Sequence, residues 1–216
     1  MTNAKKVGVL GSGDVGKVLA AGFNKHGYDT MIGSREGGKL GEWSAKTGIP
    51  EGSFVQAVDH ADIVVLAVGG RVAEDAIRLV GAERLAGKVV IDATNPLAAA
   101  PPVNGILQMF TGPNESLMER LQALAPAGRF VKAFSSVGNA FMVNPSFPGG
   151  RPTMFICGND AEAKAQVVGI LDQFGWDSED IGAVEGARAI EPLVQLWCAP
   201  GFQRGQWTHA FKLLKL

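Results

Sequence analysis

Three glycines in the segment GSGDVG, residues 11–16, leave this chain few possible folds. They follow the β-branched run KVGVLG and precede apolar residues at helical spacing, so a strand should pass through a glycine turn directly into a helix. In such a turn Gly11 allows the sharp change of direction, Gly13 leaves room for a pyrophosphate, and Gly16 lets the helix pack on the strand. The N-terminus of that helix offers amide donors to phosphate. The motif predicts a dinucleotide-binding site rather than a glycine turn without a ligand.

Apolar runs and helical periods alternate along the following part of the chain. Strands are expected at residues 6–11, 28–33, 61–68, 87–93 and 129–134, and helices at 39–47, 54–59, 72–80 and 115–124. The continuous apolarity of these strands indicates burial on both faces beneath flanking helices. Strands that alternate with helices build a parallel sheet with right-handed crossovers. We therefore expect an α/β fold with a doubly wound parallel sheet of the Rossmann NAD(P)-binding type.

A smaller α/β unit is expected after this sheet. The run TMFICG predicts a strand at 153–158, and apolar residues on one face of 163–174 predict a helix. We expect a dinucleotide-binding domain over residues 1–146 and a C-terminal extension over 147–216 that completes the cleft.

The end of the chain is apolar and rich in tryptophan. Pro192 suits the first turn of a helix, which should stop at Pro200 and Gly201. The sequel GFQRGQWTHAFKLLKL is too apolar for a free tail, so it should pack on its own sheet or on a second subunit.

Charge and cysteine usage exclude several classes of partner. With 20 basic and 21 acidic residues the chain has a net charge of −1 and no basic run, so it lacks the electrostatic footprint of a nucleic-acid-binding protein. The N-terminal stretch MTNAKKVGVLGSG has no apolar run of signal-peptide length, which predicts a cytoplasmic protein without a membrane partner. Cys157 and Cys198 form no CxxC or Cys/His cluster, so we expect core packing for both and no metal site.

The second expected strand ends in IGSRE, at the position where NAD-binding chains carry an acidic residue for the ribose hydroxyls. Here Ser34 offers a hydroxyl donor and Arg35 a planar guanidinium, which suit the dianionic 2′-phosphate of NADP. Lys39 adds a third positive contact or, alternatively, a solvated charge. Glu36 would repel a phosphate unless its side chain points away. The pattern favours NADP over NAD.

The sequence contains no convincing acid–base pair. His26, His60 and His209 have no partner pattern and suit surface or core roles. Asp92 and Lys132 lie at expected strand ends, where they could face the cleft; the alternatives are a backbone hydrogen bond for Asp92 and an amine that reaches solvent for Lys132. Hydride exchange between two redox cofactors depends more on positioning and water exclusion than on proton transfer. We therefore predict no catalytic acid or base.

The chain resembles the family of NADPH-dependent reductases of the deazaflavin coenzyme F(420), which is related to the reductase domains of membrane ferric reductases. The resemblance runs nearly end to end and rests on GVLGSGDVGKVLA, IGSREGGK, ADIVVLAV, KVVIDATNPL, RFVKAFSSVG, FICGNDAEAKAQV and GARAIEPLVQLW. It implies an NADP-dependent oxidoreductase with coenzyme F(420) as co-substrate, and it suggests a homodimer.

The motif and the resemblance together imply a set of cofactor-binding residues. These are Gly11, Ser12, Gly13, Asp14, Val15, Gly16, Ser34, Arg35, Lys39, Val68, Gly69, Asn95, Pro96, Ser135, Val137 and Gly138. The resemblance assigns phosphate contacts to Ser12, Ser34, Arg35 and Lys39, nicotinamide-side loops to Val68, Gly69, Asn95 and Pro96, and the segment against the deazaflavin to Ser135, Val137 and Gly138. Ser135 and Asn95 are the candidates for positioning at the reaction centre.

Three hypotheses about function stay open. The first is hydride transfer between NADP(H) and a deazaflavin or flavin acceptor. The second is an NADPH-dependent reductase of a small carbonyl or imine, for which Asp92, Lys132 or Ser135 would supply a proton. The third is a non-catalytic NADP-sensing protein. The loop at 98–114, with three prolines, either walls an apolar ligand pocket or is a surface excursion.

Overall fold

The computed structural model describes residues 4–216, so the first three residues of the N-terminal stretch lie outside the described part. Its strands are β1 (Lys6–Leu10), β2 (Asp29–Ser34), β3 (Glu51–Ser53), β4 (Ile63–Leu66), β5 (Val89–Asp92), β6 (Arg129–Lys132), β7 (Thr153–Ile156) and β8 (Asp177–Asp180). Its α-helices are α1 (Asp14–Lys25), α2 (Gly41–Thr47), α3 (Phe54–His60), α4 (Ala73–Val80), α5 (Ala82–Leu85), α6 (Leu117–Leu124), α7 (Ala161–Gln173), α8 (Ala187–Ile190) and α9 (Leu193–Arg204). Short 3-10 helices are η1 (Gly70–Val72), η2 (Asn139–Phe141) and η3 (Val184–Gly186).

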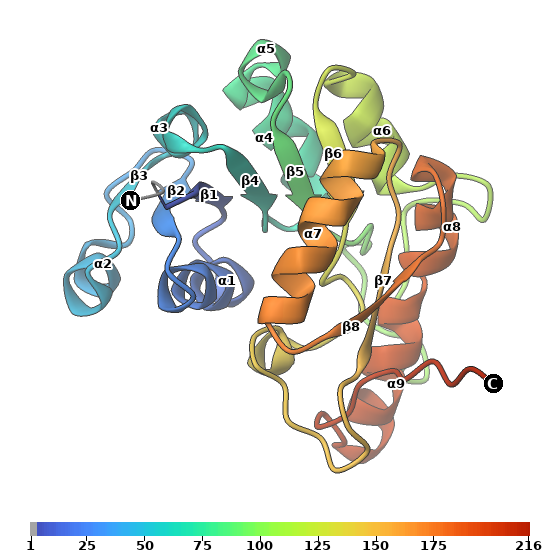
Figure 1. Cartoon of the computed structure of the whole chain (residues 1–216). Coiled ribbons are helices and arrows are strands. Elements are labelled where there is room, and N and C mark those ends of the chain that lie inside the picture. Colours follow the sequence, from blue (N-terminus) through green and yellow to red (C-terminus); the bar gives the residue numbers. More distant parts are fainter. Residues whose placement is uncertain (1–3) are drawn as a thin grey trace.

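Six strands form one parallel sheet in the order β3-β2-β1-β4-β5-β6 (Figure 1). The central strand β1 pairs in parallel with both β2 and β4, so that Val9 lies beside Ile32 on one side and Val65 on the other. The strand order reverses between β1 and β4, which is the point where doubly wound sheets bind ligands. The predicted α/β fold with a doubly wound parallel sheet is confirmed.

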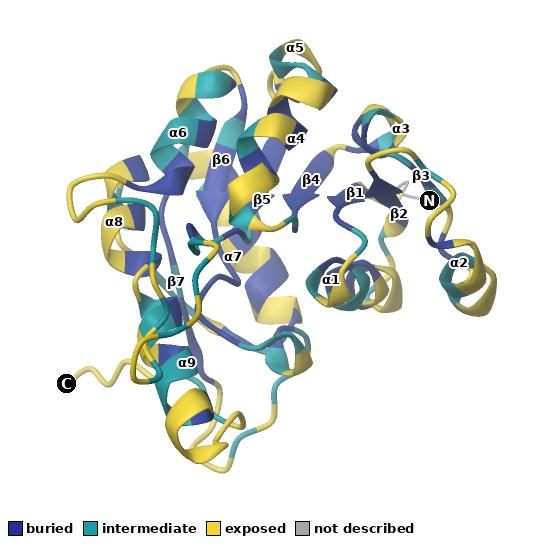
Figure 2. Ribbon diagram, turned by 180° about the vertical axis from the view of Figure 1, so that it is seen from behind, coloured by how far each residue is buried: buried dark blue, intermediate teal, exposed yellow. Residues whose placement is uncertain are grey.

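Two hydrophobic cores fill the spaces between this sheet and its helices. One joins Val9 of β1 and Phe23 of α1 to apolar residues of α7. The other joins Leu66 of β4 to Phe54 of α3 and Ile77 of α4. Figure 2 shows the strands buried and the outer sides of the helices exposed. Burial on both faces explains why the central strands β4 and β5 are almost entirely apolar.

The C-terminal extension is an α/β unit that is attached to the edge of the sheet. Strands β7 and β8 form a parallel pair connected by α7. An antiparallel bridge joins Lys132 of β6 to Cys157, with the Lys132 amide donating to the Cys157 carbonyl at 3.0 Å. One core cluster contains residues from both parts of the chain. The boundary between 1–146 and 147–216 therefore stays a prediction.

Phe174, which caps the end of α7, ties the extension to the sheet. Its buried ring lies 5.0 Å from the ring of Phe23 and 6.1 Å from that of Phe134, centroid to centroid. Phe174→Ala is expected to lower the free energy of unfolding by about 3–5 kcal/mol, because it leaves a cavity between two parts of the fold. A urea titration monitored by tryptophan fluorescence measures this free energy. The unsubstituted protein and the Phe174→Ala variant should each unfold in a single transition. Two separate transitions in the unsubstituted protein would contradict a shared core.

Two strands were not predicted from the sequence. Strand β3 has the sequence EGS and β8 the sequence DSED, and neither shows an apolar pattern. Both form because a neighbouring strand supplies backbone partners, β2 for β3 and β7 for β8. Pairing with an existing strand depends on the backbone, so a polar segment at a sheet edge can adopt it.

The predicted stop of the last helix at Pro200 and Gly201 is wrong. Helix α9 continues through both residues to Arg204 and ends at Gly205, which has a left-handed φ of 68°. Proline inside a helix removes one backbone hydrogen bond. Packing outweighs this loss, because Gly201 is buried and the Trp207 ring folds back against its Cα.

Residues 205–216 have no regular secondary structure but pack on their own chain. The Trp197 indole Nε1 donates to the His209 carbonyl at 2.9 Å. The amide of Thr153, at the start of β7, donates to the Phe211 carbonyl at 2.8 Å. These contacts show that part of the segment packs on its own fold, which is one of the two arrangements expected for it.

Within residues 4–216, no helix is both long and apolar enough to span a membrane. The same residues contain no cluster of three or more His, Cys, Asp or Glu side chains that could hold a metal ion. Cys157 is buried and Cys198 is partly buried, and both are free thiols. Burial raises the pKa of Cys157 to about 12, which agrees with the packing role predicted for it.

Candidate functional site

The turn between β1 and α1 leaves an open space in front of a helix N-terminus. Gly11 adopts a φ of 139°, a backbone conformation that residues other than glycine rarely adopt. A Cβ atom on Gly16 would lie 1.9 Å from the Gly11 carbonyl oxygen, whereas a Cβ on Gly13 would have no atom within 4 Å. No side chain caps the N-terminus of α1. The free space at Gly13 and the uncapped amides fit a pyrophosphate.

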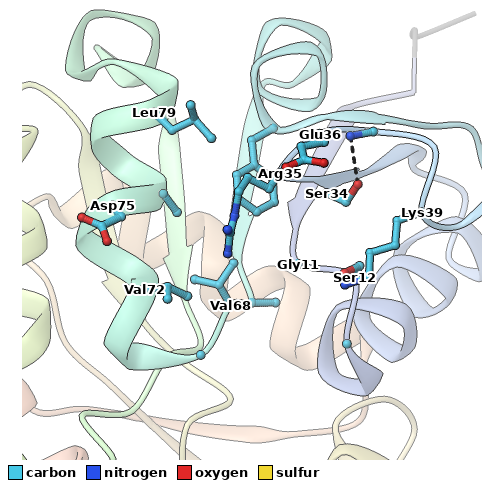
Figure 3. A pocket seen from close by; sticks show the side chains of 16 residues that line it. Gly11, Ser12, Ser34, Arg35, Glu36, Lys39, Val68, Val72, Asp75 and Leu79 are labelled. Carbon is cyan, nitrogen blue, oxygen red and sulfur yellow. Dashed lines mark hydrogen bonds between the residues drawn. The ribbon is translucent and has the colours of Figure 1, made fainter.

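A pocket of about 840 Å³ opens from this turn across the carboxyl ends of β1, β2 and β4. Eight of the residues predicted to bind the cofactor line it: Gly11, Ser12, Gly13, Ser34, Arg35, Lys39, Val68 and Gly69. Figure 3 labels six of them, which come from three separate loops around the pocket: Gly11, Ser12, Ser34, Arg35, Lys39 and Val68. Asp14, Val15 and Gly16 form the first turn of α1 behind the glycine turn rather than the pocket wall.

The loop after β2 brings a hydroxyl and two cationic side chains to the pocket. Ser34 is buried, and its Oγ accepts a hydrogen bond from the Gly37 amide at 3.1 Å, which leaves its hydroxyl hydrogen free to donate. Arg35 and Lys39 are exposed on the pocket wall. Glu36 also lines the pocket, but Figure 3 shows its carboxylate and the Arg35 guanidinium pointing in different directions. These groups suit a phosphate dianion.

An apolar wall of the same pocket was not predicted from the sequence. Val72, Ala76 and Leu79 follow one another at helical spacing along η1 and α4, and Phe54 stands opposite at the start of α3. Val72 is 41% exposed and Leu79 is 50% exposed, which is unusual for large apolar side chains beside a polar loop. Such a wall suits the face of an aromatic base. The signal was present in the sequence, because these residues form a second apolar face on a helix whose other face is buried.

Five predicted residues lie outside the walls of this pocket: Asn95, Pro96, Ser135, Val137 and Gly138. They lie in the loops that follow β5 and β6, and the Asn95 Nδ2 donates to the Ser135 carbonyl at 2.7 Å. Asn95 Oδ1 and Ser135 Oγ are buried without a hydrogen-bond partner in the described structure. Buried polar atoms without partners are rare, so these two are candidate ligand contacts.

The loop after β6 contains a strained residue. Phe134 has a φ of 63°, a left-handed conformation that is an outlier for a bulky side chain. Its amide points to the Met154 Sδ at 3.2 Å instead of continuing the sheet. This conformation costs roughly 1–3 kcal/mol, which the buried ring of Phe134 must offset. The turn redirects the chain immediately before Ser135.

Neither the Lys132 nor the Asp92 side chain faces the pocket. Both side chains are 0% exposed, so Lys132 does not reach solvent, and neither residue lines the pocket. The Lys132 Nζ lies 2.7 Å from the Asp92 carboxylate and 2.8 Å from that of Glu191, a residue that the sequence analysis did not single out. Burial alone would lower the pKa of the Lys132 ammonium, but the two carboxylates outweigh it and raise that pKa above its usual value. The expected backbone hydrogen bond of Asp92 is observed, from the Thr94 amide at 2.9 Å.

The histidines have structural partners away from the pocket, as expected. His26 Nε2 lies 3.1 Å from Asn144 Oδ1, and His60 Nε2 lies 3.1 Å from the Asp29 carbonyl. His209 stacks on the Trp197 ring at 5.0 Å.

The loop at 98–114 lies along helix α9. Leu97, just before the loop, forms an antiparallel bridge with Met109 inside it, and the Gln195 Nε2 of α9 donates to the Leu107 carbonyl at 2.6 Å. No residue of this loop lines the 840 Å³ pocket, although Ala98, Ala99 and Phe110 line a separate groove of about 410 Å³. The loop is therefore a surface excursion with respect to the main pocket.

Comparison with known proteins gives a consistent set of relatives. The model of the family described as "NADP oxidoreductase coenzyme F420-dependent" matches residues 6–96. An F420-dependent NADP reductase of Methanocaldococcus jannaschii is 30% identical over 205 residues, covering 88% of this chain and 90% of the relative. A solved structure from Arthrobacter sp. FB24, described as a candidate F420-dependent NADP-reductase, superposes with a TM-score of 0.91 at 30% identity and covers 99% of this chain and 100% of its own.

Two other groups of proteins are also similar to this chain. The metalloreductase STEAP3 of Rattus norvegicus is 29% identical over 191 residues, which cover 88% of this chain but only 36% of the relative. The chain thus spans little more than a third of that protein. An imine reductase of Myxococcus stipitatus in complex with NAD+ shares the fold, with a TM-score of 0.67 at 20% identity over 91% of this chain and 62% of its own.

Proposed function

The chain belongs to the family of coenzyme F(420)-dependent NADP oxidoreductases, and on this basis we propose that it transfers a hydride between NADP(H) and a deazaflavin or flavin acceptor. The observation that supports the proposal best is the pocket that joins the β1–α1 glycine turn to the Ser34, Arg35 and Lys39 side chains. It combines a pyrophosphate site with a cationic site for a 2′-phosphate.

The pocket residues would hold the adenosine half of NADPH. The amides at the start of α1 would bind the pyrophosphate, and the Arg35 guanidinium and Ser34 hydroxyl the 2′-phosphate. The wall of Val72, Ala76 and Leu79 would cover the adenine.

The loops after β4, β5 and β6 would hold the reacting half. We place the nicotinamide against Val68, Gly69, Asn95 and Pro96. A primary carboxamide both donates and accepts hydrogen bonds, so it would pair with the unpartnered Asn95 Oδ1 and Ser135 Oγ. The deazaflavin or flavin would lie against the segment from Ser135 to Gly138.

The proposed reaction needs no residue of the chain as an acid or base. NADPH supplies a hydride from its nicotinamide ring, and the acceptor takes its proton from solvent. The protein positions the two rings and excludes water. Asn95 and Ser135 act in positioning only.

We further propose that the enzyme works in the cytoplasm as a homodimer, with the division into residues 1–146 and 147–216 described above. Apolar side chains exposed on α9 and in the last residues support an interface: Leu196 (61%), Phe202 (47%), Trp207 (40%) and Leu214 (83%). Sedimentation velocity tests the dimer.

Absorbance of NADPH in the presence of each acceptor tests the activity. Oxidation is expected with coenzyme F(420), FMN and FAD offered in turn, fastest with the deazaflavin, and with NADPH preferred over NADH. Tight NADPH binding without turnover on any acceptor would contradict hydride transfer to this class.

The carbonyl or imine reductase hypothesis is not favoured by the site. Of its three proposed proton donors, Asp92 and Lys132 are paired with each other in a buried ion cluster that also includes Glu191. Only Ser135 is left, and a serine hydroxyl is a weak acid on its own.

A further inference from the structure

A buried ion cluster connects the C-terminal extension to the nicotinamide-side loop. It consists of Asp92 at the end of β5, Lys132 at the end of β6 and Glu191 between α8 and α9, with exposed fractions of 0%, 0% and 1%. Complete burial of three charged groups is costly, so such clusters need full pairing. The proposed reaction makes no direct use of them.

Each group in the cluster has partners that tie different parts of the fold together. The Lys132 Nζ donates a hydrogen bond to the Thr94 carbonyl at 3.0 Å and forms ion pairs with Asp92 Oδ2 at 2.7 Å and Glu191 Oε1 at 2.8 Å. The Glu191 carboxylate also accepts from the Leu117 and Met118 amides at 2.9 and 3.0 Å. These two amides open helix α6, whose dipole favours a negative charge.

The cluster holds Thr94 at three atoms. Its carbonyl accepts from Lys132, and its amide and hydroxyl donate to Asp92 Oδ1 at 2.9 and 2.7 Å. Asp92 Oδ2 has only its ion pair with Lys132, without hydrogen-bond geometry. The carbonyl of Thr94 therefore depends on the ammonium, whereas its amide and hydroxyl depend on the carboxylate.

Segment 94–97 contacts the two neighbouring loops of the proposed cofactor site, so the position of Thr94 affects these loops. Asn95 donates to the Ser135 carbonyl, and a Cβ atom on Gly70 would lie 1.9 Å from the Asn95 carbonyl oxygen. Gly70 adjoins Gly69 in the pocket wall. A displacement of Asn95 would thus move the loops after both β4 and β6.

We propose that Lys132 is a positioning residue for hydride transfer, whose buried ammonium fixes the Thr94 carbonyl and with it the nicotinamide-side segment 94–97. The inference rests on the proposed function, because it takes this segment as the nicotinamide contact. Asp92 and Glu191 keep the ammonium in place.

A double substitution separates positioning from folding. Lys132→Met alone leaves two buried carboxylates uncompensated and is expected to lower Tm by roughly 10 °C. Lys132→Met combined with Asp92→Asn keeps the net charge of the cluster at −1, because one carboxylate then replaces two carboxylates and one ammonium. The new amide oxygen still accepts from Thr94, and Glu191 keeps its two backbone donors. This double variant is expected to fold with a Tm closer to that of the unsubstituted protein.

Three measurements compare the double variant with the unsubstituted protein. Amide hydrogen exchange of segment 94–97, measured without cofactor, should become about tenfold faster. The affinity for NADPH should change by less than about threefold, because the adenosine half binds elsewhere, while kcat falls at least about tenfold. The fluorescence of bound NADPH, which reports on the nicotinamide environment, should shift toward that of free NADPH.

Lys164→Met is the matched control. The Lys164 Nζ also joins a carboxylate, Asp180 at 2.8 Å, to a carbonyl, Gly182 at 3.2 Å, but within the extension. It should change none of the three readouts.

Unchanged exchange in segment 94–97 of the double variant would overturn the proposal. Faster exchange with unchanged bound-NADPH fluorescence and kcat would overturn it as well, because the segment would then not position the nicotinamide. The amide hydrogen exchange of segment 94–97 and the fluorescence of bound NADPH can both be measured without a hydride acceptor. If the unsubstituted protein reduces no deazaflavin or flavin, the proposed function fails, while these two measurements still test Lys132.

Discussion

Arg35→Ala is expected to weaken NADPH binding about 100-fold and to change NADH binding by less than about threefold. The Arg35 side chain lines the pocket in the loop after β2. Its partner would be the 2′-phosphate, which NADH lacks, so its loss removes charge-assisted hydrogen bonds to NADPH alone. Equilibrium titration of both nucleotides by fluorescence measures the two affinities.

Arg204→Ala serves as the control for this substitution. Arg204 is exposed at the end of α9 and does not line the pocket, so its loss should leave both affinities unchanged. Lys39→Ala should have a smaller effect than Arg35→Ala, because an ammonium makes a point contact rather than a planar fork. Equal losses of NADPH and NADH affinity in Arg35→Ala would show that the side chain does not select the phosphate.

Two alanine substitutions in the glycine turn are expected to affect different properties: one lowers stability and the other weakens NADPH binding. Gly16→Ala should lower the free energy of unfolding by about 3 kcal/mol, because its methyl would lie 1.9 Å from the Gly11 carbonyl oxygen and force α1 away from β1. Gly13→Ala should leave stability almost unchanged, since its backbone φ of −80° suits alanine and no atom lies within 4 Å. Its methyl should instead occupy the pyrophosphate space and weaken NADPH binding about 30-fold.

Urea unfolding and nucleotide titration of both variants decide the result. A Gly13→Ala protein that binds NADPH normally would place the pyrophosphate elsewhere. A Gly16→Ala protein as stable as the unsubstituted one would mean that the helix can shift without cost.

The part of the pocket around the glycine turn could be predicted because it is encoded locally. Strand β1, the glycine turn and α1 are consecutive in the sequence. The glycines directly indicate where the backbone needs a sharp turn or a close approach. Ser34, Arg35 and Lys39 follow one strand later and line the predicted pocket. The family resemblance rests on the same local motifs.

Other features depended on partners far away in the sequence. The polar segments EGS and DSED became strands because β2 and β7 offered them backbone groups, and α9 continued through Pro200 because it packs against the end of the chain. Single segments carry no signal for such pairings, since tertiary contacts override local preferences.

The ion cluster shows this limit most clearly. For Lys132 the sequence suggested a side chain that faces the cleft or reaches solvent, because a lysine is seldom buried unless it is paired. Its pairing depends on Glu191, whose contact with the Leu117 amide spans 74 residues. The sequence by itself determined the apolar strands of the sheet, the glycine turn and the cationic residues after β2, all of which follow from neighbouring residues. Only the tertiary structure decided which charges are buried together and which loop they hold, because burial and pairing belong to distant segments brought together by folding.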